Sequence, residues 1–277
     1  MKNKIVLITG GNAGIGKATA TGLAKMGATV IIACRNRERG MQAVEEIKQA
    51  SNNPNVDLLL MDTSSQRSVW NAVDDFKSRY SQLHVLINNA GVFLPQREVT
   101  EDGIEKTFAT NYLGHFLLTH LLLDILKASA PSRIVNVASR HSGININFDD
   151  LMLEKKYSMF RAVGTTKIGL VIFSKELAKK LEGSGVTVNS LHPGLVKTTL
   201  LKDTGFFLRT LFKIIPQVSP EKGAATSIYL ASSPEVEHVS GKYFSDKKET
   251  ATSSGANDEE KNKMLYDISL KLTGLKL

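Results

Sequence analysis

The chain has 277 residues, 42% hydrophobic and 22% charged, and carries 35 lysines and arginines against 27 aspartates and glutamates. This composition excludes a disordered, collagen-like or disulfide-rich protein and is typical of one large soluble α/β domain over 1–277. The single cysteine, Cys34, cannot form an internal disulfide, which fits a reducing setting. The lysines behind the net charge of +8 are dispersed, which favours a solvated basic surface over a nucleic-acid partner.

No apolar run approaches the ~20 residues that cross a bilayer. The first apolar stretch begins at Ile5, and no charged segment followed by a long apolar one precedes it. We therefore expect a protein with no membrane span, located in the cytoplasm.

The first stretch, residues 5–16, reads IVLITGGNAGIG and leads into a helical pattern. A β-branched apolar run is typical of a buried parallel strand, and the glycines that follow it each have a physical task. Gly10 permits a tight turn, Gly14 lets the backbone approach a pyrophosphate, and Gly16 lets the new helix lie close to the sheet. Such turns also occur for structural reasons alone, but the strand–loop–helix context favours a dinucleotide site.

A second apolar strand is predicted at 28–34, and Arg35 and Asn36 follow it. An acidic residue at this point binds the ribose 2′-hydroxyl of NAD, whereas an arginine can fork onto the 2′-phosphate of NADP. Arg35 therefore favours NADP(H), unless it only faces solvent.

The third and fourth strands are predicted at 56–61 and 85–87. Asp62 follows the third strand, where the adenine would lie, and the fourth runs into Asn88-Asn89-Ala90-Gly91. Amide side chains can hold the ends of neighbouring strands, so we expect a structural as well as a ligand-binding role for this segment.

One long helix is predicted from about 108 to 127, and Asn111 lies inside its apolar pattern. Asparagine is a poor residue for a helix interior, so its presence needs a reason. The strand at 133–137 then leads to Ser139 at its carboxyl end, the edge where open parallel sheets bind ligands.

These motifs together resemble the short-chain dehydrogenases/reductases, which share the TG-x-x-x-G-x-G loop, NNAG and a serine after the fifth strand. The later segments KELAKKLEGSGVTVNSLHPGLVKT, SIYLASSPE and VSGKYF narrow the resemblance to the retinol-dehydrogenase-like branch. It implies a Rossmann-like, doubly wound parallel sheet of about seven strands flanked by helices. It also implies NADP(H) and a small apolar alcohol or carbonyl as ligands. Homo-oligomers through the long helices are common in the family.

The resemblance also implies roles for particular residues. Asn111 holds a water of a proton relay, Ser139 orients the substrate carbonyl, and Lys167 holds the ribose and lowers the pKa of a tyrosine. His192, Pro193 and Gly194 begin the loop that cradles the nicotinamide carboxamide. The cofactor contacts implied are those of Gly10, Asn12, Gly14, Ile15, Gly16, Arg35, Asn36, Asp62, Thr63, Asn89, Ala90, Gly91, Lys167, Pro193, Gly194, Val196 and Thr198; no metal site is expected.

The family's catalytic pair is Y-x-x-x-K, and the residue four before Lys167 is Val163. Valine cannot donate a proton. Tyr157 lies ten residues before the lysine, about 15 Å along a helix, and is rejected as a substitute. His141, two residues after Ser139, is more simply a structural or exposed histidine.

Two hypotheses about function follow. The first is an oxidoreductase whose activity is impaired by valine at the tyrosine position, whether native or introduced. The second is a natural non-catalytic module that binds a dinucleotide or an apolar ligand. In either case the apolar segment at 199–219 is interpreted as a substrate lid, with a core helix or a partner-binding surface as alternatives.

Overall fold

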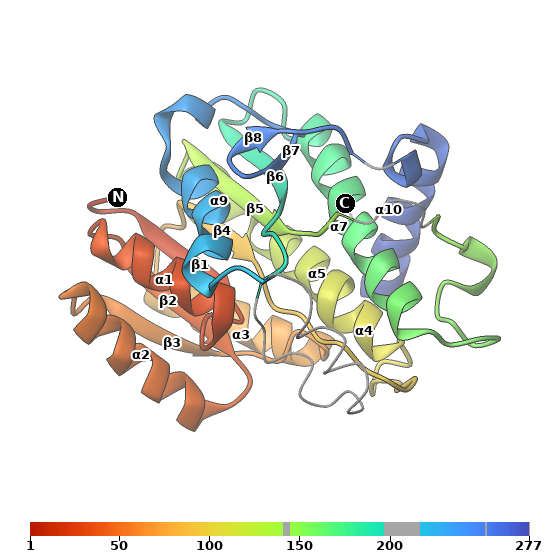
Figure 1. Ribbon diagram of the computed structural model, residues 1–277, viewed down its shortest axis with the longest axis horizontal. Coiled ribbons are helices and arrows are strands. Elements are labelled where there is room, and N and C mark those ends of the chain that lie inside the picture. The colour runs from red at the N-terminus through yellow and green to blue at the C-terminus, as the bar shows by residue number, and fades with distance from the viewer. Residues whose placement is uncertain (141–144, 197–216, 253, 277) are drawn as a thin grey trace.

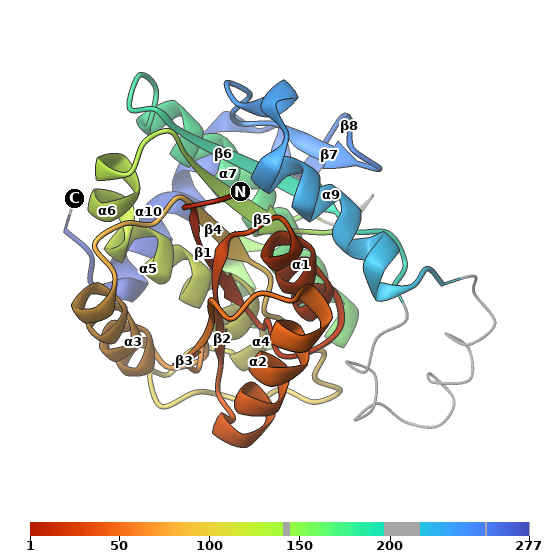
Figure 2. The same ribbon diagram turned by 90° about the vertical axis from the view of Figure 1, so that its left-hand side faces the viewer.

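The computed structural model describes residues 1–140, 145–196, 217–252 and 254–276 (Figure 1). Within these ranges the chain forms a mostly parallel sheet covered by helices on both faces (Figure 2). This is the doubly wound Rossmann-like α/β fold that the sequence predicts.

The sheet has eight strands in the order β3-β2-β1-β4-β5-β6-β7-β8. Seven strands are parallel, and the short β8 pairs antiparallel with β7 at the edge. About seven strands are expected from the sequence, and β8 is not among them. The strands are β1 (Ile5–Thr9), β2 (Thr29–Cys34), β3 (Val56–Leu60), β4 (Val85–Asn88), β5 (Ser132–Val137), β6 (Val186–His192), β7 (Tyr243–Ser245) and β8 (Lys248–Glu249).

Helices connect the strands. The longer ones are α1 (Gly14–Lys25), α2 (Arg37–Ser51), α3 (Gln66–Arg79), α5 (Gly114–Leu121), α6 (Leu123–Ala128), α7 (Met159–Lys180), α9 (Pro220–Ser232) and α10 (Glu259–Thr273). The shorter ones are α4 (Lys106–Phe108), the π-helix η1 (Ala109–Leu113) and the 3₁₀ turns η2 (Phe148–Asp150), η4 (Pro234–Val236) and η5 (Ser254–Ala256).

Alternating side chains of the central strands build two cores. In β1, Leu7 packs into the core shared with α3, α5, α7 and α10, whereas Val6 and Ile8 pack into the core shared with α1, α2 and α9. Successive side chains of a strand point to opposite faces, so a continuous apolar strand needs cover on both sides. Figure 2 shows α1, α2 and α9 on one side of the sheet and α3, α5 and α10 on the other.

The strand order reverses beside β1, which pairs with β2 on one side and β4 on the other. In open α/β sheets, ligands bind at the carboxyl edge where the strand order reverses. The glycine-rich loop after β1 and the Asn89-Ala90-Gly91 segment after β4 both lie at this edge.

The range 108–127 predicted as one long helix is helical except for a turn at Leu122, but it is not one regular α-helix. The helical stretch is divided into α4, η1, α5 and α6, with the π-helix at Ala109–Leu113. Asn111 lies in η1, and its amide makes two hydrogen bonds to the backbone of Val92. A π-turn inside a helix usually marks a functional site, because it is less stable than the α-helix it interrupts. Among the described helices, none is both long and apolar enough to cross a membrane.

Candidate dinucleotide and catalytic site

The glycine-rich loop after β1 has the backbone geometry that its glycines predict. Gly10 and Gly14 have φ of +66° and +53°, in the left-handed region that glycine adopts without strain. A Cβ at Gly16 would lie 2.3 Å from the carbonyl oxygen of Gly10 and 2.5 Å from the Asn89 amide nitrogen. A Cβ at Gly14 would meet no atom within 4 Å, so the space beside this part of the loop is open.

The N-terminus of α1 lacks the side-chain cap that four other helices have. Side chains of Asn36, Ser65, Ser219 and Asp258 accept N–H bonds at the starts of α2, α3, α9 and α10. The α1 N-cap residue, Ala13, has no side chain that could do so. First-turn N–H groups of α1 are therefore left for an anion, and a pyrophosphate fits both their charge and the open space at Gly14.

Hydrogen bonds join the loops after β1 and β4. The Asn89 amide donates to the Thr9 carbonyl at 2.8 Å, and the backbone N–H groups of Asn89 and Ala90 both donate to the Thr9 hydroxyl at 2.9 Å. In the next layer, Asn88 donates to the Asn136 side chain at 2.8 Å. The expected structural role of these amides at the strand ends is confirmed.

At the end of β2, Arg35 is exposed and pairs with no carboxylate among the described residues. The Asn36 side chain is already used, since its oxygen accepts the Arg39 N–H at 2.8 Å and caps α2. Asp62 follows β3, and its carboxylate accepts the N–H and hydroxyl of Ser64. Among the described residues, no carboxylate therefore competes with a ligand for the Arg35 guanidinium, while Asn36 and Asp62 are held by hydrogen bonds to residues near them in sequence.

On the catalytic side, the Lys167 ammonium donates to the Val137 carbonyl at 2.7 Å, two residues before Ser139. Burial lowers the pKa of Lys167 to about 8. Val163, one turn earlier on α7, is only 2% exposed. Lys167 therefore lies at the end of β5 that leads to half-buried Ser139. The apolar side chain of Val163 lies one turn before Lys167 on α7.

Asn111 is buried and bound to the loop after β4. Its amide oxygen accepts the Val92 N–H at 2.7 Å, and its amide nitrogen donates to the Val92 carbonyl at 3.0 Å. The same oxygen lies near Gly91, since a Cβ there would be 3.4 Å from it. Asn111 therefore connects η1 to the dinucleotide edge of the sheet, which is the reason a polar residue interrupts the apolar helix.

At the end of β6, the His192 ring accepts the Arg140 backbone N–H at 3.2 Å, which joins this strand to the residue after Ser139. Gly194 has φ of +84°, and Val196 forms a parallel bridge with Val218. Pro193, Gly194 and Val196 thus lie at the same edge as Ser139. Thr198 and most of the predicted lid at 199–219 lie outside the described residues.

Of the two residues rejected as substitutes for the missing tyrosine, the structure describes Tyr157 but not His141. Tyr157 precedes α7, so the helical spacing used to exclude it does not apply. Its hydroxyl donates to the Leu94 carbonyl at 2.8 Å, in the loop after β4, and burial raises its pKa. Tyr157 is therefore engaged with that loop by its own hydrogen bond. His141 lies outside the described residues.

One further residue of this region, His115, is not among the site residues predicted from the sequence. His115 is fully buried, and its ring lies 2.9 Å from the Thr9 hydroxyl and 3.2 Å from the Asn111 carbonyl. Its spacing of four residues after Asn111 is the signal that could have found it, since such residues share a helix face.

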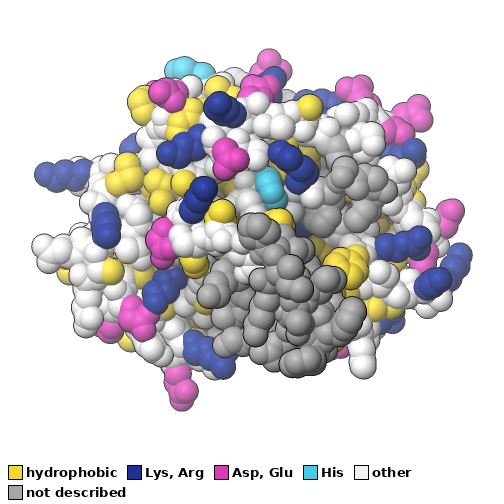
Figure 3. Space-filling view, viewed as in Figure 1, with side chains coloured by type: hydrophobic (Ala, Val, Ile, Leu, Met, Phe, Trp, Pro, Cys, Tyr) yellow, Lys and Arg dark blue, Asp and Glu magenta, His cyan; other side chains and the backbone are white. Residues whose placement is uncertain are grey.

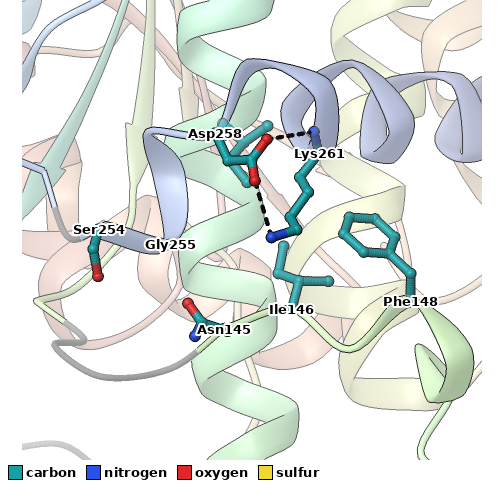
Figure 4. Close-up of a pocket in the computed structure, with 8 residues that line it drawn as sticks. Asn145, Ile146, Phe148, Ser254, Gly255, Asp258 and Lys261 are labelled. Carbon is teal, nitrogen blue, oxygen red and sulfur yellow. Dashed lines mark hydrogen bonds and ion pairs between the residues drawn. The ribbon is translucent and has the colours of Figure 1, made fainter.

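Two described cavities lie near α7. One of about 100 Å³ is at the start of α10, where Lys261 pairs with Asp258 at 2.9 Å (Figure 4). The other, of about 290 Å³, is lined by Arg161 and Thr165 of α7 together with residues of 145–153. Because Thr165 is two residues from both Val163 and Lys167, it lies on the opposite face of the helix from them. The part of the larger cavity that Thr165 lines therefore faces away from Val163 and Lys167.

Lysine and arginine side chains are scattered over the face shown in Figure 3, with acidic side chains between them. This distribution agrees with a solvated basic surface.

The chain is similar to short chain dehydrogenases, and among them to proteins named retinol dehydrogenases. A family model described as short chain dehydrogenase matches residues 4–205. Human retinol dehydrogenase 14 is 45% identical over 99% of this chain and 88% of its own length, and mouse retinol dehydrogenase 13 is 44% identical over 98% and 84%.

Solved structures show the same fold. An uncharacterised protein from Mycobacterium paratuberculosis matches with a TM-score of 0.81 and 30% identity, over 99% of this chain and 95% of that one. A short chain dehydrogenase from Burkholderia cenocepacia, solved in complex with NADP, matches with a TM-score of 0.70 and 26% identity, over 93% of this chain and 99% of that one.

Proposed function

Because the chain belongs to the short-chain dehydrogenase family, in its retinol-dehydrogenase-like branch, we propose that it is an NADP(H)-dependent oxidoreductase. Its substrate is an apolar alcohol or the corresponding aldehyde or ketone. The observation that carries the proposal is the shared sheet edge, where the open loop at Gly14 and the uncapped start of α1 lie with Lys167 at the end of β5. When bound, the nicotinamide supplies or takes up a hydride at the substrate carbon.

The preference for NADP(H) over NAD(H) rests on Arg35. An exposed guanidinium without a carboxylate partner among the described residues suits a 2′-phosphate, for which it offers two parallel N–H donors. An acidic residue at this point would repel the phosphate.

The substrate class rests on relatives. Proteins 44–45% identical to this chain are named retinol dehydrogenases, and retinol is a long apolar alcohol. The apolar residues of 199–219 support the same class by their composition.

The proton step distinguishes this chain from the family pattern. Ser139 can orient the substrate oxygen with its hydroxyl, and Lys167 can bind the ribose and hold positive charge near it. Position 163 has no acid, and loss of a positioned general acid lowers a rate by about 10²–10⁴-fold. We therefore propose weak activity. The alternative is a non-catalytic binding module of the same fold, which the buried valine supports equally.

A single-turnover experiment separates these functions. Excess protein is mixed with NADPH and a panel of apolar aldehydes and ketones, and NADPH absorbance and alcohol product are both measured. Weak activity predicts slow conversion that falls further in Ser139→Ala. Tight NADPH binding with no product from any carbonyl would support the binding module, and no NADPH binding would contradict both.

A further inference from the structure

His115 on α5 lies where three parts of the site meet. One ring nitrogen, Nε2, is 2.9 Å from the hydroxyl of Thr9 at the end of β1. The other, Nδ1, is 3.2 Å from the main-chain carbonyl oxygen of Asn111 in η1. The side chain is fully buried, so both nitrogens depend on these partners.

The hydrogen bonds of Thr9 decide which ring nitrogen carries the proton. A hydroxyl has one proton to donate and two lone pairs to accept with. The Thr9 oxygen already accepts the N–H groups of Asn89 and Ala90, both at 2.9 Å. Its own proton can go to His115 Nε2 at 2.9 Å or to the Ile87 carbonyl at 3.5 Å, and the shorter contact is the better hydrogen bond. Nε2 is therefore an acceptor, and Nδ1 carries the proton that Asn111 accepts.

The surroundings keep this imidazole neutral. Burial is the main cause that lowers the pKa of His115, to about 3, and the ammonium of Lys167 on α7 lowers it further. The one effect that raises it is the hydrogen bond to the Asn111 carbonyl. Among the described groups that act on the ring, no carboxylate opposes Lys167.

We propose that His115 is a positioning residue of the dinucleotide site, which acts as the neutral Nδ1–H tautomer. It receives the proton of the Thr9 hydroxyl, so that both lone pairs of that oxygen stay directed at the N–H groups of Asn89 and Ala90. Through Nδ1 it also donates to the main-chain carbonyl of Asn111, and the side chain of Asn111 in turn binds the Val92 backbone. One imidazole thus aligns the loops after β1 and β4 with η1. Its effect on cofactor affinity rests on the proposed function, whereas the tautomer does not.

The tautomer is tested by long-range ¹H–¹⁵N NMR on protein labelled at histidine, with the His115 signals assigned from their absence in His115→Leu or by triple-resonance methods. The expected pattern is a protonated Nδ1 and an unprotonated Nε2 that does not titrate between about pH 8 and about pH 5. A protonated Nε2, or titration within that range, would overturn the proposal whether or not the protein binds NADPH.

The positioning role is tested by NADPH affinity in His115→Leu, with His120→Leu as the matched control. His120 is also a buried histidine on α5, but its ring binds the Tyr266 hydroxyl, away from the cofactor loops. Both variants lose stability, whereas only His115→Leu is expected to weaken NADPH binding, by about tenfold. Equal affinities for wild type and a folded His115→Leu would overturn the proposal.

Thr9 variants keep the test decisive if His115→Leu does not fold. Thr9→Ser keeps the hydroxyl and should bind NADPH as the wild type does, whereas Thr9→Val should bind about tenfold more weakly and shift the His115 Nε2 resonance. An unchanged Nε2 resonance in Thr9→Val would mean that the hydroxyl does not donate to His115, and the proposal would fail.

Discussion

Val163 occupies the turn of α7 before Lys167, and its side chain is buried. The Lys167 ammonium donates a hydrogen bond to the Val137 carbonyl, and burial lowers its pKa to about 8. A phenol placed one turn earlier would lie on the same helix face as this cation.

Val163→Tyr is accordingly expected to increase NADPH-dependent reduction of apolar carbonyls by about 10²-fold or more, because it restores a general acid beside Lys167. Initial rates over a panel of aldehydes and ketones measure the gain. Val163→Phe is the matched control: it adds the same ring to a buried site, with a similar packing penalty of about 1–3 kcal/mol, but no hydroxyl. If folded Val163→Tyr binds NADPH but reduces the carbonyls no faster than Val163→Phe, the non-catalytic module becomes the better account.

Arg35→Asp is expected to weaken NADPH binding by about tenfold or more, because a carboxylate repels the 2′-phosphate, and to leave NADH binding equal or stronger. Fluorescence titration of both cofactors measures this. Arg39→Asp makes the same charge change at another exposed arginine, in the first turn of α2, and should weaken NADPH binding less. Equal losses in the two variants would mean that Arg35 acts only through general charge.

At the scale of elements, α10 is attached to α5 and α7 by an aromatic cluster with one buried hydrogen bond. The His120 ring stacks on Phe173 and contacts Phe116 at a tilt, and its Nε2 lies 2.7 Å from the Tyr266 hydroxyl of α10. Since Nδ1 lies 2.7 Å from the Phe116 carbonyl, both ring nitrogens are satisfied.

Tyr266→Phe should therefore lower the free energy of unfolding by about 1–3 kcal/mol, because it leaves His120 Nε2 buried without a partner. Urea denaturation measures the change. Tyr229→Phe removes a hydroxyl that binds Glu235 at the surface, and should change stability by less than about 0.5 kcal/mol. Similar losses of unfolding free energy in both variants would show that the buried hydrogen bond stabilises the fold no more than the exposed one.

The division of the predicted long helix is also an effect at this scale. The apolar pattern of 108–127 is continuous, so periodicity alone predicts one helix. Within the π-turn at Ala109–Leu113, the Asn111 side chain exchanges two hydrogen bonds with the backbone of Val92, 19 positions earlier. The poor helix propensity of Asn111 indicates where the helix is irregular, but it does not predict that the irregularity is a π-turn.

At the scale of the whole molecule, the buried histidines His115 and His120 couple the free energy of unfolding to pH. The folded-state pKa is about 3 for His115 and about 4 for His120, mainly because of burial, against the ordinary value of 6.5. Below about pH 6.5 the unfolded chain binds protons that the folded chain does not, so stability falls as pH decreases towards about 4 and is fully present above about 6.5.

The expected slope is roughly 1.4 kcal/mol per pH unit for each histidine within this window. Urea unfolding between about pH 7 and about pH 5 measures it, and His120→Gln should reduce the slope by about one histidine's share. A slope in the His120→Gln variant equal to that of the wild type would contradict this origin.

The sequence by itself determined the parallel α/β sheet, the glycine-rich loop and the order of the site residues, because β-branched runs, glycines and caps act through local backbone preferences. Tertiary structure decided the features that depend on contacts between distant residues. These are β8 at the sheet edge, the π-turn at Asn111, the position of Tyr157 before the start of α7, and the place of His115 between Thr9 and Asn111. A hydrogen bond between residues about a hundred positions apart leaves no periodic trace in the chain. Histidine at position 115 acquires its partners only when β1 and α5 pack together.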